Sequence, residues 1–286
     1  MIEYLNLLDN IMCNGTPKSG EKPDGTITLF GAMVKYDLSA GFPLVTTRDL
    51  SGSWERIIRA ELLWFLSGST NTKDLEEKFG CKLWNKWAEE SRMKIGTPPG
   101  ELGPIYGRQF RNWNGHLDQL AELIQLLKTV PDTRRGVLTL WNPDDVNPGG
   151  IKKVNIANCI TQLHFDKIKH KIGDDQYEDR LDMTMVHRSA DASAGIPHDV
   201  AEFALLQMLI AREVGLPPGT LVNFIDEAQI YDKQKKLVRE LLLRKPHQLP
   251  TVTISPGSGT IFDHSIEDFE LHNYEHGEYM KIPVAL

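Results

Sequence analysis

The apolar run at residues 200–214 is the sequence feature that most constrains how this chain can fold. A run of this length and composition is typical of a helix buried in a protein core. Its most apolar part, residues 203–211, is far shorter than the roughly 20 residues needed to cross a bilayer. Asp199 stands directly before the run and Glu202 follows three residues later, a pattern that predicts an N-cap at Asp199 and a capping box with Glu202. We therefore expect a core helix and no membrane-spanning segment.

Length, charge and cysteine content narrow the class of protein. The 286 residues, 41% of them hydrophobic, can fill one large core or two small ones, and we expect a single domain at residues 1–286. The formal net charge of −7 argues against a general nucleic-acid surface, because such a surface needs a positive field. Three cysteines cannot all pair, and neither a C-x-x-C motif nor a secretory signal is present. These features predict a reduced, cytoplasmic protein without a metal site.

Helices and strands are both indicated by the periodicity of apolar residues. Helical spacing is found at residues 54–66 and 117–130, and strand-like patterns occupy residues 136–141, 156–165, 180–186 and 251–254. The stretch ESRMKIGTPPGELGP (residues 90–104) is polar and contains Gly and Pro, which predicts a loop within the domain. Long helices and several strands in mixed order predict an α/β or α+β fold.

Cys159 lies within one of the strand-like segments and has two interpretations. A single cysteine in a strand is commonly a buried, inert side chain. Nearby cations would instead favour a thiolate nucleophile, and the chain offers Arg134, Arg135 and Arg188. The adjacent arginines also fit a solvated strand edge, whereas Arg188 followed by Ser189 fits a small phosphate site, because guanidinium and hydroxyl groups both bind phosphate oxygens.

A series of longer motifs resembles the thymidylate synthase family along nearly the whole chain. The matching segments are GFPLVTTRD (residues 41–49), ELLWFLSGSTN (61–71), LWNKWAEE (83–90), ELGPIYGRQFR (101–111), PDTRRG, ANC, HRSAD, GIP and the terminal KIPVAL. The resemblance implies a mixed β-sheet with flanking helices that dimerises through the sheet. It also implies transfer of a one-carbon unit from the co-substrate 5,10-methylenetetrahydrofolate to C5 of a pyrimidine nucleotide.

Several residues match family positions that act on the nucleotide. By this resemblance Cys159 is the nucleophile that adds to C6 of the pyrimidine. Glu61 moves protons at the base and the folate, and Tyr106 lies beside the C5 proton. The phosphate would be bound by Arg188 and Ser189 of the same subunit and by Arg134 and Arg135 of the partner subunit of a homodimer.

Other residues match family positions that contact the folate. Asp191 and Gly195 match folate contacts, and Asp191 is expected to contact the nucleotide as well. Arg48 matches a basic residue near the glutamate tail of the folate. Trp84 and Trp87 match tryptophans that flank the folate, although on their own both resemble core residues. The terminal residues 283–286, ending at Leu286, match a segment that closes over the ligands.

Asp199 departs from the pattern of thymidylate synthases in a way that bears on the base. That family has asparagine there, whose amide offers C=O to the N3 proton of uracil and NH₂ to O4. Cytosine reverses the pattern, because it offers an amino donor at N4 and an acceptor at N3. A carboxyl group can accept from N4 and, when protonated, donate to N3. The same difference marks the deoxycytidylate hydroxymethylases of the superfamily, so Asp199 predicts cytosine recognition beside the capping interpretation.

Four further departures concern the surroundings of the ligands. His198 replaces an aromatic residue against the folate ring, where it helps water to enter or simply begins a helix. Ile160 replaces a histidine near O4 of uracil, which disfavours uracil. Gln229 stands where a histidine helps to bind the sugar, although Tyr231 is retained, so a ribonucleotide stays open as a substrate. Glu21 replaces a phosphate-binding arginine, so either the neighbouring Lys22 substitutes for it after a small shift or the phosphate is held by one cation fewer.

These observations lead to one preferred hypothesis and several alternatives. The preferred activity is dCMP 5-hydroxymethylation with methylenetetrahydrofolate and water. The alternatives are C5 methylation of dCMP or CMP, which Trp84 and the PVAL terminus favour, CMP 5-hydroxymethylation and, less favoured, methylation of dUMP. A non-catalytic nucleotide-binding or RNA-binding relative is a different class of protein, and the intact set of Cys159, Glu61, Tyr106 and Arg188 argues against it.

Overall fold

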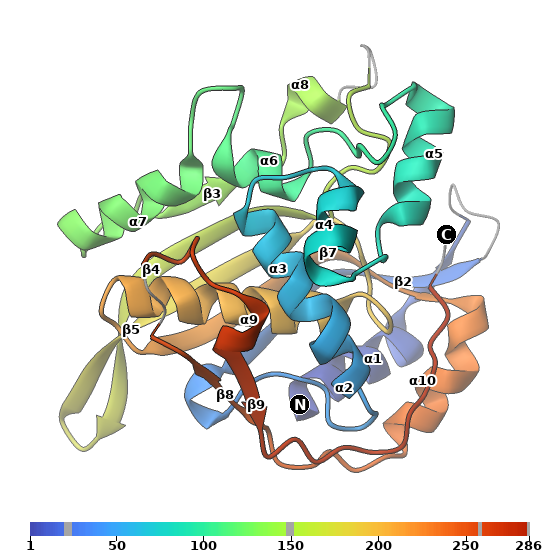
Figure 1. Cartoon of the computed structure of the whole chain (residues 1–286). Coiled ribbons are helices and arrows are strands. Elements are labelled where there is room, and N and C mark those ends of the chain that lie inside the picture. Colours follow the sequence, from blue (N-terminus) through green and yellow to red (C-terminus); the bar gives the residue numbers. More distant parts are fainter. Residues whose placement is uncertain (20–24, 147–151, 257–258, 285–286) are drawn as a thin grey trace.

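A mixed β-sheet with helices packed on it organises the computed structural model, which describes residues 1–19, 25–146, 152–256 and 259–284 (Figure 1). The strand order is β1-β2-β7-β5-β4-β3, and β6 pairs with β7. β7 runs parallel to β5 and β6 and antiparallel to β2, and the pairs β1–β2, β3–β4 and β4–β5 are antiparallel. The prediction of a mixed sheet flanked by helices is confirmed.

The strands and helices alternate unevenly along the chain. The strands are β1 (Thr16–Lys18), β2 (Thr26–Asp37), β3 (Val137–Thr139), β4 (Ile160–Gly173), β5 (Gln176–His187), β6 (Ala190–Asp191), β7 (Pro218–Tyr231), β8 (Thr251–Ile254) and β9 (Phe269–His272). The α-helices are α1 (Ile2–Asn14), α2 (Ser51–Ser53), α3 (Arg59–Leu66), α4 (Thr72–Phe79), α5 (Asn85–Ile95), α6 (Tyr106–Arg111), α7 (Gln119–Thr129), α8 (Pro143–Val146), α9 (Ile196–Glu213) and α10 (Lys235–Leu242). A π-helical segment, Trp54–Ile58, joins α2 to α3, and short 3₁₀ turns cover Leu38–Ala40, Asp232–Gln234 and Ile266–Asp268.

The core lies between the sheet and the helices that cover one of its faces. α9 packs on β5 and β7, and α1 packs on β2 and β7. Alternate residues of β5, namely Leu181, Met183 and Met185, are fully buried, as the two-residue period of a strand requires. Helix α9 is buried around most of its circumference, which explains why its sequence is nearly continuous in apolar residues.

The start of α9 differs from the sequence prediction. The helix begins at Ile196 with Gly195 at the N-cap position and Pro197 in its first turn, where proline needs no backbone N–H. Asp199 therefore lies inside the first turn, and the predicted N-cap at Asp199 is wrong. The predicted capping box is wrong for the same reason, since the side chain of Glu202 is buried instead of reaching back to the helix start.

Other elements begin or end at residues that differ from the sequence prediction. The segment predicted as a loop at residues 90–104 begins inside α5, which ends where Gly96 adopts a left-handed conformation with φ of 72°. The strand predicted from residue 156 begins only at Ile160, and β8 matches its predicted bounds. The predicted helix at residues 54–66 is confirmed as the π-helical segment followed by α3, and the predicted helix at residues 117–130 is confirmed as α7.

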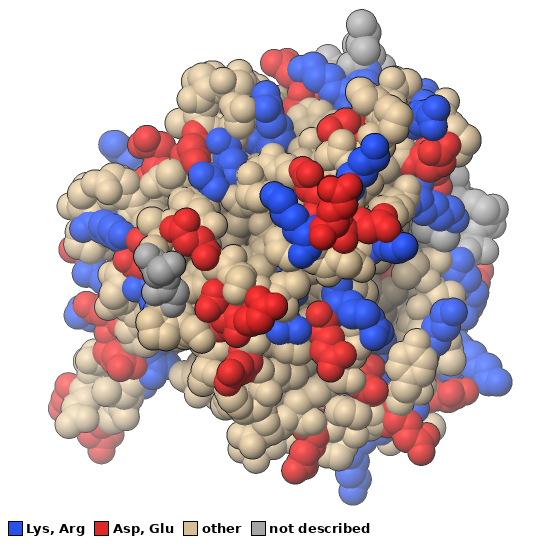
Figure 2. All heavy atoms as spheres, in the orientation of Figure 1, with Lys and Arg blue, Asp and Glu red and all other residues tan. Residues whose placement is uncertain are grey.

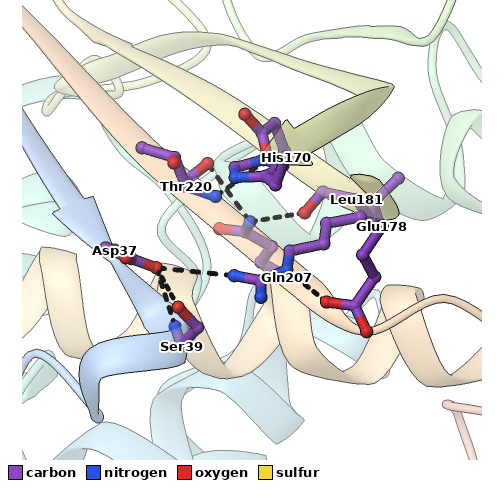
Figure 3. A network of polar contacts seen from close by, with 9 residues as sticks. Asp37, Ser39, His170, Glu178, Leu181, Gln207 and Thr220 are labelled. Carbon is purple, nitrogen blue, oxygen red and sulfur yellow. Dashed lines mark hydrogen bonds and ion pairs between the residues drawn. The ribbon is translucent and has the colours of Figure 1, made fainter. Parts of the chain in front are cut away.

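A polar network fixes α9 against the sheet at the end remote from residue 199 (Figure 3). The buried Gln207 donates to the backbone oxygens of Leu181 (2.8 Å) and Thr220 (3.3 Å), which ties the helix to β5 and β7. Asp182 accepts from the Thr220 backbone N–H at 2.9 Å and lies 2.7 Å from His170 Nε2. A side chain at Gly219 would place its Cβ 1.9 Å from Asp182 Oδ1, so any larger residue there would displace the Asp182 carboxyl group from this network.

The surface carries mixed charge. On the face shown in Figure 2, Lys and Arg side chains are interspersed with Asp and Glu. Within the described ranges, no helix is long and apolar enough to span a membrane.

Candidate active site

Cys159 lies directly before β4, beside the hydroxyl group of Tyr106. The Tyr106 Oη accepts hydrogen bonds from the backbone N–H groups of Cys159 (2.8 Å) and Ile160 (3.2 Å). Both acceptor sites of Oη are thereby used, so the hydroxyl hydrogen can point towards a third group. The pKa of Tyr106 is raised well above its usual value, first by burial and then by the charges of Cys159 and Asp199. A neutral phenol therefore stands next to the candidate nucleophile.

Arg188 follows β5 and is bonded to the segment that carries Cys159. Its backbone N–H donates to the Cys159 carbonyl at 2.9 Å. Its Nε and Nη2 donate to the carbonyls of Asn158 and Ala157 at 2.8 and 2.9 Å. A guanidinium has five N–H donors, so two side-chain bonds leave others for an anion. The structure thus brings the predicted phosphate ligand and the predicted nucleophile together.

Ser189 and Gln229 are hydrogen-bonded to each other near the same place. Gln229 Nε2 donates to Ser189 Oγ at 2.7 Å and to Glu227 Oε1 at 2.8 Å. Gln229 also pairs with Asp191 in the β6–β7 ladder, and Tyr231 ends β7 with 8% of its surface exposed. The predicted phosphate contact Ser189 therefore lies between β5 and β6, beside the predicted sugar contact Gln229 on β7.

Glu61 projects from α3 into the protein interior, where three polar groups meet. The indole Nε1–H of Trp84 donates to Glu61 Oε1 at 2.5 Å, and the Glu202 carboxyl group of α9 is hydrogen-bonded to Glu61. Burial raises the pKa of Glu61 to about 7, and the charge of Asp199 also raises it, against the hydrogen bonds from Trp84 and Glu202. The pKa of Glu202 is raised well above its usual value by burial and by the charges of Glu61 and Asp199. Glu202 is therefore the member of the pair that keeps its proton.

Asp199 is joined to the sheet through a buried histidine. Its Oδ2 lies 3.1 Å from Nε2 of His187, the last residue of β5, and Nδ1 of His187 lies 2.8 Å from Oδ1 of Asn223 on β7. The side chain of His187 is completely buried, whereas that of Asp199 is 32% exposed. One end of this chain of contacts thus lies in the core, and the other lies at the accessible carboxyl group of Asp199.

Several of the predicted folate residues lie around the start of α9. Asp191 accepts from the backbone N–H of Ala194 at 2.9 Å and from Gln234 Nε2 at 2.7 Å, and burial raises its pKa. Arg48 is 5% exposed, and its Nη2 donates to the Ser193 carbonyl at 3.3 Å. Gly195 occupies the N-cap position of α9.

His198 bridges the start of α9 and the end of α2. Its Nδ1 lies 2.9 Å from the Ala194 carbonyl, which can only accept, so Nδ1 carries the hydrogen and Nε2 accepts from Ser53 Oγ at 3.0 Å. Burial lowers the pKa of His198, which keeps the ring neutral.

Trp84, which donates to Glu61, packs against a second tryptophan, Trp87. The ring centroids of Trp84 and Trp87 are 5.3 Å apart, and that of Trp84 lies 6.4 Å from that of Phe65. Both tryptophans are partly buried and pack against the core.

Some predicted site residues lie elsewhere. Arg134 and Arg135 are separated by Gly136 from β3, which forms one edge of the sheet, and both are exposed. Lys22 and Leu286 fall outside the described residues.

His187, Asn223 and Glu202 are polar residues of the site that sequence reasoning missed. His187 lies directly before Arg188 in the HRSAD motif, and Glu202 lies one helical turn after Asp199. Both positions were visible in the sequence, but their pairing with Asp199 and Glu61 depends on contacts between distant segments.

A comparison with known families agrees with this geometry. A family model described as thymidylate synthase matches residues 2–286. The chain therefore belongs to the thymidylate synthase family. It is accordingly a one-carbon transferase acting at C5 of a pyrimidine nucleotide, with methylenetetrahydrofolate as the co-substrate.

Proposed function

We propose that this enzyme hydroxymethylates C5 of dCMP, with water as the final acceptor of the activated carbon. The observation that carries the proposal is the carboxyl group of Asp199 at a site where uracil recognition calls for an amide. Asp199 lies in the first turn of α9, with its carboxyl group partly accessible. A carboxyl group complements N4 and N3 of cytosine, whereas an amide complements N3 and O4 of uracil.

The described side chains suit the proposed steps on the pyrimidine. The Cys159 thiolate adds to C6, which makes C5 nucleophilic and divides one difficult substitution into easier steps. Tyr106 places a neutral hydroxyl group beside the backbone of Cys159. Arg188 and Ser189 hold the phosphate. The pKa of Glu61, about 7, allows it to gain and lose protons at neutral pH, as proton transfer to and from water requires.

The residues near α9 fit a folate co-substrate. Methylenetetrahydrofolate supplies one carbon at the oxidation level of formaldehyde. Trp84 and Trp87 offer aromatic surface, and Asp191, Gly195 and His198 lie together at the start of α9. Within the described part of the chain, the buried Nε of Arg48 has no hydrogen-bond partner, as expected of a cation that awaits an anionic or carbonyl group.

The last step separates hydroxymethylation from its nearest alternative. In the proposed route C5 bonds to the methylene carbon of methylenetetrahydrofolate, and loss of the C5 proton expels tetrahydrofolate and leaves an exocyclic methylene group at C5. Water then adds to this methylene group, Glu61 accepts the proton that water loses, and the bond from Cys159 to C6 breaks to release the product. Hydride transfer from tetrahydrofolate, which becomes dihydrofolate, would give 5-methyl-dCMP instead, and the retained Trp84, bonded to Glu61, is the observation that favours it. Gln229, in place of a sugar-binding histidine, keeps CMP as an alternative nucleotide.

We further propose a homodimer with phosphate sites shared between subunits. The sheet face opposite the helices exposes apolar side chains, including Phe30 (79% exposed) and the cross-strand pair Met33 and Phe224. Exposed apolar surface of this kind is typical of an interface. The exposed Arg134 and Arg135 are then available to the partner's phosphate site. We also propose that residues 1–286 form one catalytic domain that works in the cytoplasm.

Product analysis tests the proposed function directly. The purified enzyme is incubated with methylenetetrahydrofolate and dCMP, CMP or dUMP, and the nucleotide and folate products are identified by mass spectrometry. Formation of 5-hydroxymethyl-dCMP together with tetrahydrofolate supports the proposal. 5-Methyl-dCMP with dihydrofolate establishes methylation, and turnover of dUMP alone rejects cytosine recognition. Absence of tritium release from 5-³H-labelled dCMP, CMP and dUMP would indicate a non-catalytic relative.

A further inference from the structure

His187 is a buried histidine whose two ring nitrogens both face oxygen atoms. Nδ1 lies 2.8 Å from Asn223 Oδ1, and Nε2 lies 3.1 Å from Asp199 Oδ2. His187 and Asn223 are both 0% exposed, so bulk water does not compete for the contact between them, whereas the Asp199 side chain is 32% exposed. The two contacts anchor the Asp199 carboxyl group to the sheet through Oδ2, while the side chain stays 32% exposed and accessible to a ligand.

The chemistry of these atoms determines how many hydrogens the chain of contacts holds. An amide oxygen only accepts, so Nδ1 of His187 carries a hydrogen that it donates to Asn223. If His187 is neutral, its Nε2 has no hydrogen, and the contact with Asp199 requires a protonated carboxyl. If the carboxyl is ionised, Nε2 must carry the hydrogen. In either case one proton lies between His187 and Asp199.

The other groups that face Asp199 are anionic or neutral. Glu61 of α3 and Glu202 of α9 each interact electrostatically with Asp199, and so does the Tyr106 hydroxyl of α6. His198, in the same turn of α9, also interacts with Asp199, but both of its nitrogens are bonded elsewhere. His187 is therefore the group in direct contact with the Asp199 carboxyl that can exchange a proton with it.

We propose that His187 is a positioning residue that holds the Asp199 carboxyl group and shares with it the proton required at N3 of cytosine. This inference rests on the proposed function. When Cys159 adds to C6, electron density moves into the ring, and N3 becomes more basic. Asp199 must then donate to N3 while it accepts from N4. A carboxylate alone cannot donate, so the proton shared with His187 supplies the missing donor. Uracil carries its own proton at N3 and has no such requirement.

Substitution of His187 by glutamine tests the shared proton. Glutamine can donate a hydrogen bond to Asp199 but has no proton that it exchanges at neutral pH. For H187Q we expect kcat with dCMP to fall at least about tenfold, or about 1.4 kcal/mol, with KM changed less than about threefold. H170Q is the matched control, because His170 also contacts an aspartate, Asp182 at 2.7 Å, but lies at the remote end of the sheet. H170Q should keep wild-type kcat.

A second variant tests the same proton and leaves both His187 and Asp199 unsubstituted. N223A removes the acceptor at Nδ1, so a neutral His187 can place its hydrogen on Nε2 and donate to an ionised Asp199. The carboxyl group then holds no proton for N3. We expect kcat with dCMP to fall, but less than in H187Q, while KM stays near the wild-type value.

The background of D199N distinguishes proton sharing from a structural role. Asparagine has no proton to share, so adding H187Q to D199N should leave kcat with dUMP within about twofold. If H187Q and N223A both keep wild-type kcat with dCMP, the inference is wrong. It is also wrong if H187Q costs as much in D199N as in the wild type. Those results leave the proposed function intact, whereas failure of the wild-type enzyme to turn over dCMP overturns both.

Discussion

The indole N–H of Trp84 and the carboxyl group of Glu61 form a hydrogen bond of 2.5 Å in the interior of the protein. Glu61 is also hydrogen-bonded to Glu202, so the two form a buried pair of carboxyl groups. The indole of Trp84 donates to Glu61 of this pair. Two buried carboxyl groups in contact do not both ionise, because like charges repel strongly in a medium of low polarity. The indole favours ionisation of Glu61, and Glu202 keeps the proton.

This asymmetry predicts different effects for two matched substitutions. E61Q should lower kcat by at least about a hundredfold, because an amide cannot accept a proton from water. E202Q should keep kcat within about fivefold, because glutamine can still donate to Glu61 as the protonated Glu202 does. Steady-state kinetics of the two variants on the best nucleotide test this assignment. The opposite order of effects would make Glu202 the base.

The same pair predicts how stability depends on pH. The pKa of Glu61 is raised from 4.5 to about 7 by burial, so the folded protein binds this proton more tightly than the unfolded chain. The contribution of this proton to the free energy of unfolding is complete below about pH 4.5 and is lost as pH rises through 7. It amounts to about 3 kcal/mol of unfolding free energy. Urea unfolding of the wild type and E61Q between pH 4.5 and 8 measures it. Equal slopes against pH for the two proteins would contradict this origin.

The sequence predicts the main elements of the fold better than their ends. The run at residues 200–214 gives a buried helix because apolar residues face all sides, but its start depends on Pro197 and on the hydrogen bonds that Asp191 accepts. β2 and β7 are not indicated by the sequence pattern. Exposed Phe30 and Met33, and polar Asn223 at a buried position of β7, break the usual alternation.

The candidate site shows the same limit. Cys159, Tyr106 and Arg188 are found from motifs, and the structure brings them together as expected. Glu202 is visible in the sequence only as a possible helix cap, because its partner Glu61 lies on a different helix. His187 is missed because its role depends on Asn223 and Asp199, which come from two other elements.

Covalent catalysis predicts a specific loss for C159S. Serine is a much weaker nucleophile at neutral pH than a thiolate, so kcat should fall by at least about a thousandfold. Nucleotide binding, measured by calorimetry, should stay within about threefold, because the phosphate and base contacts remain. A C159S enzyme with near-normal turnover would remove the covalent step from the mechanism.

The shared phosphate site predicts complementation between inactive subunits. C159A lacks the nucleophile, and R135A lacks a cation that we place in the partner's site. A mixed dimer can assemble one site that lacks neither group, so a mixture of the two proteins should regain up to about a quarter of wild-type activity after subunit exchange. Exchange is verified by mass spectrometry of differently tagged subunits. If mixed dimers form and activity stays at background, Arg135 does not act across the interface.

The most direct test of cytosine recognition is the specificity of D199N. Asparagine retains an oxygen for His187 and a similar shape, but it offers the amide pattern suited to uracil. The account predicts that the ratio of kcat/KM for dCMP to that for dUMP falls at least about tenfold, equivalent to about 1.4 kcal/mol of transition-state discrimination, mainly through loss of dCMP turnover. An unchanged ratio between wild type and D199N would show that Asp199 does not read the base.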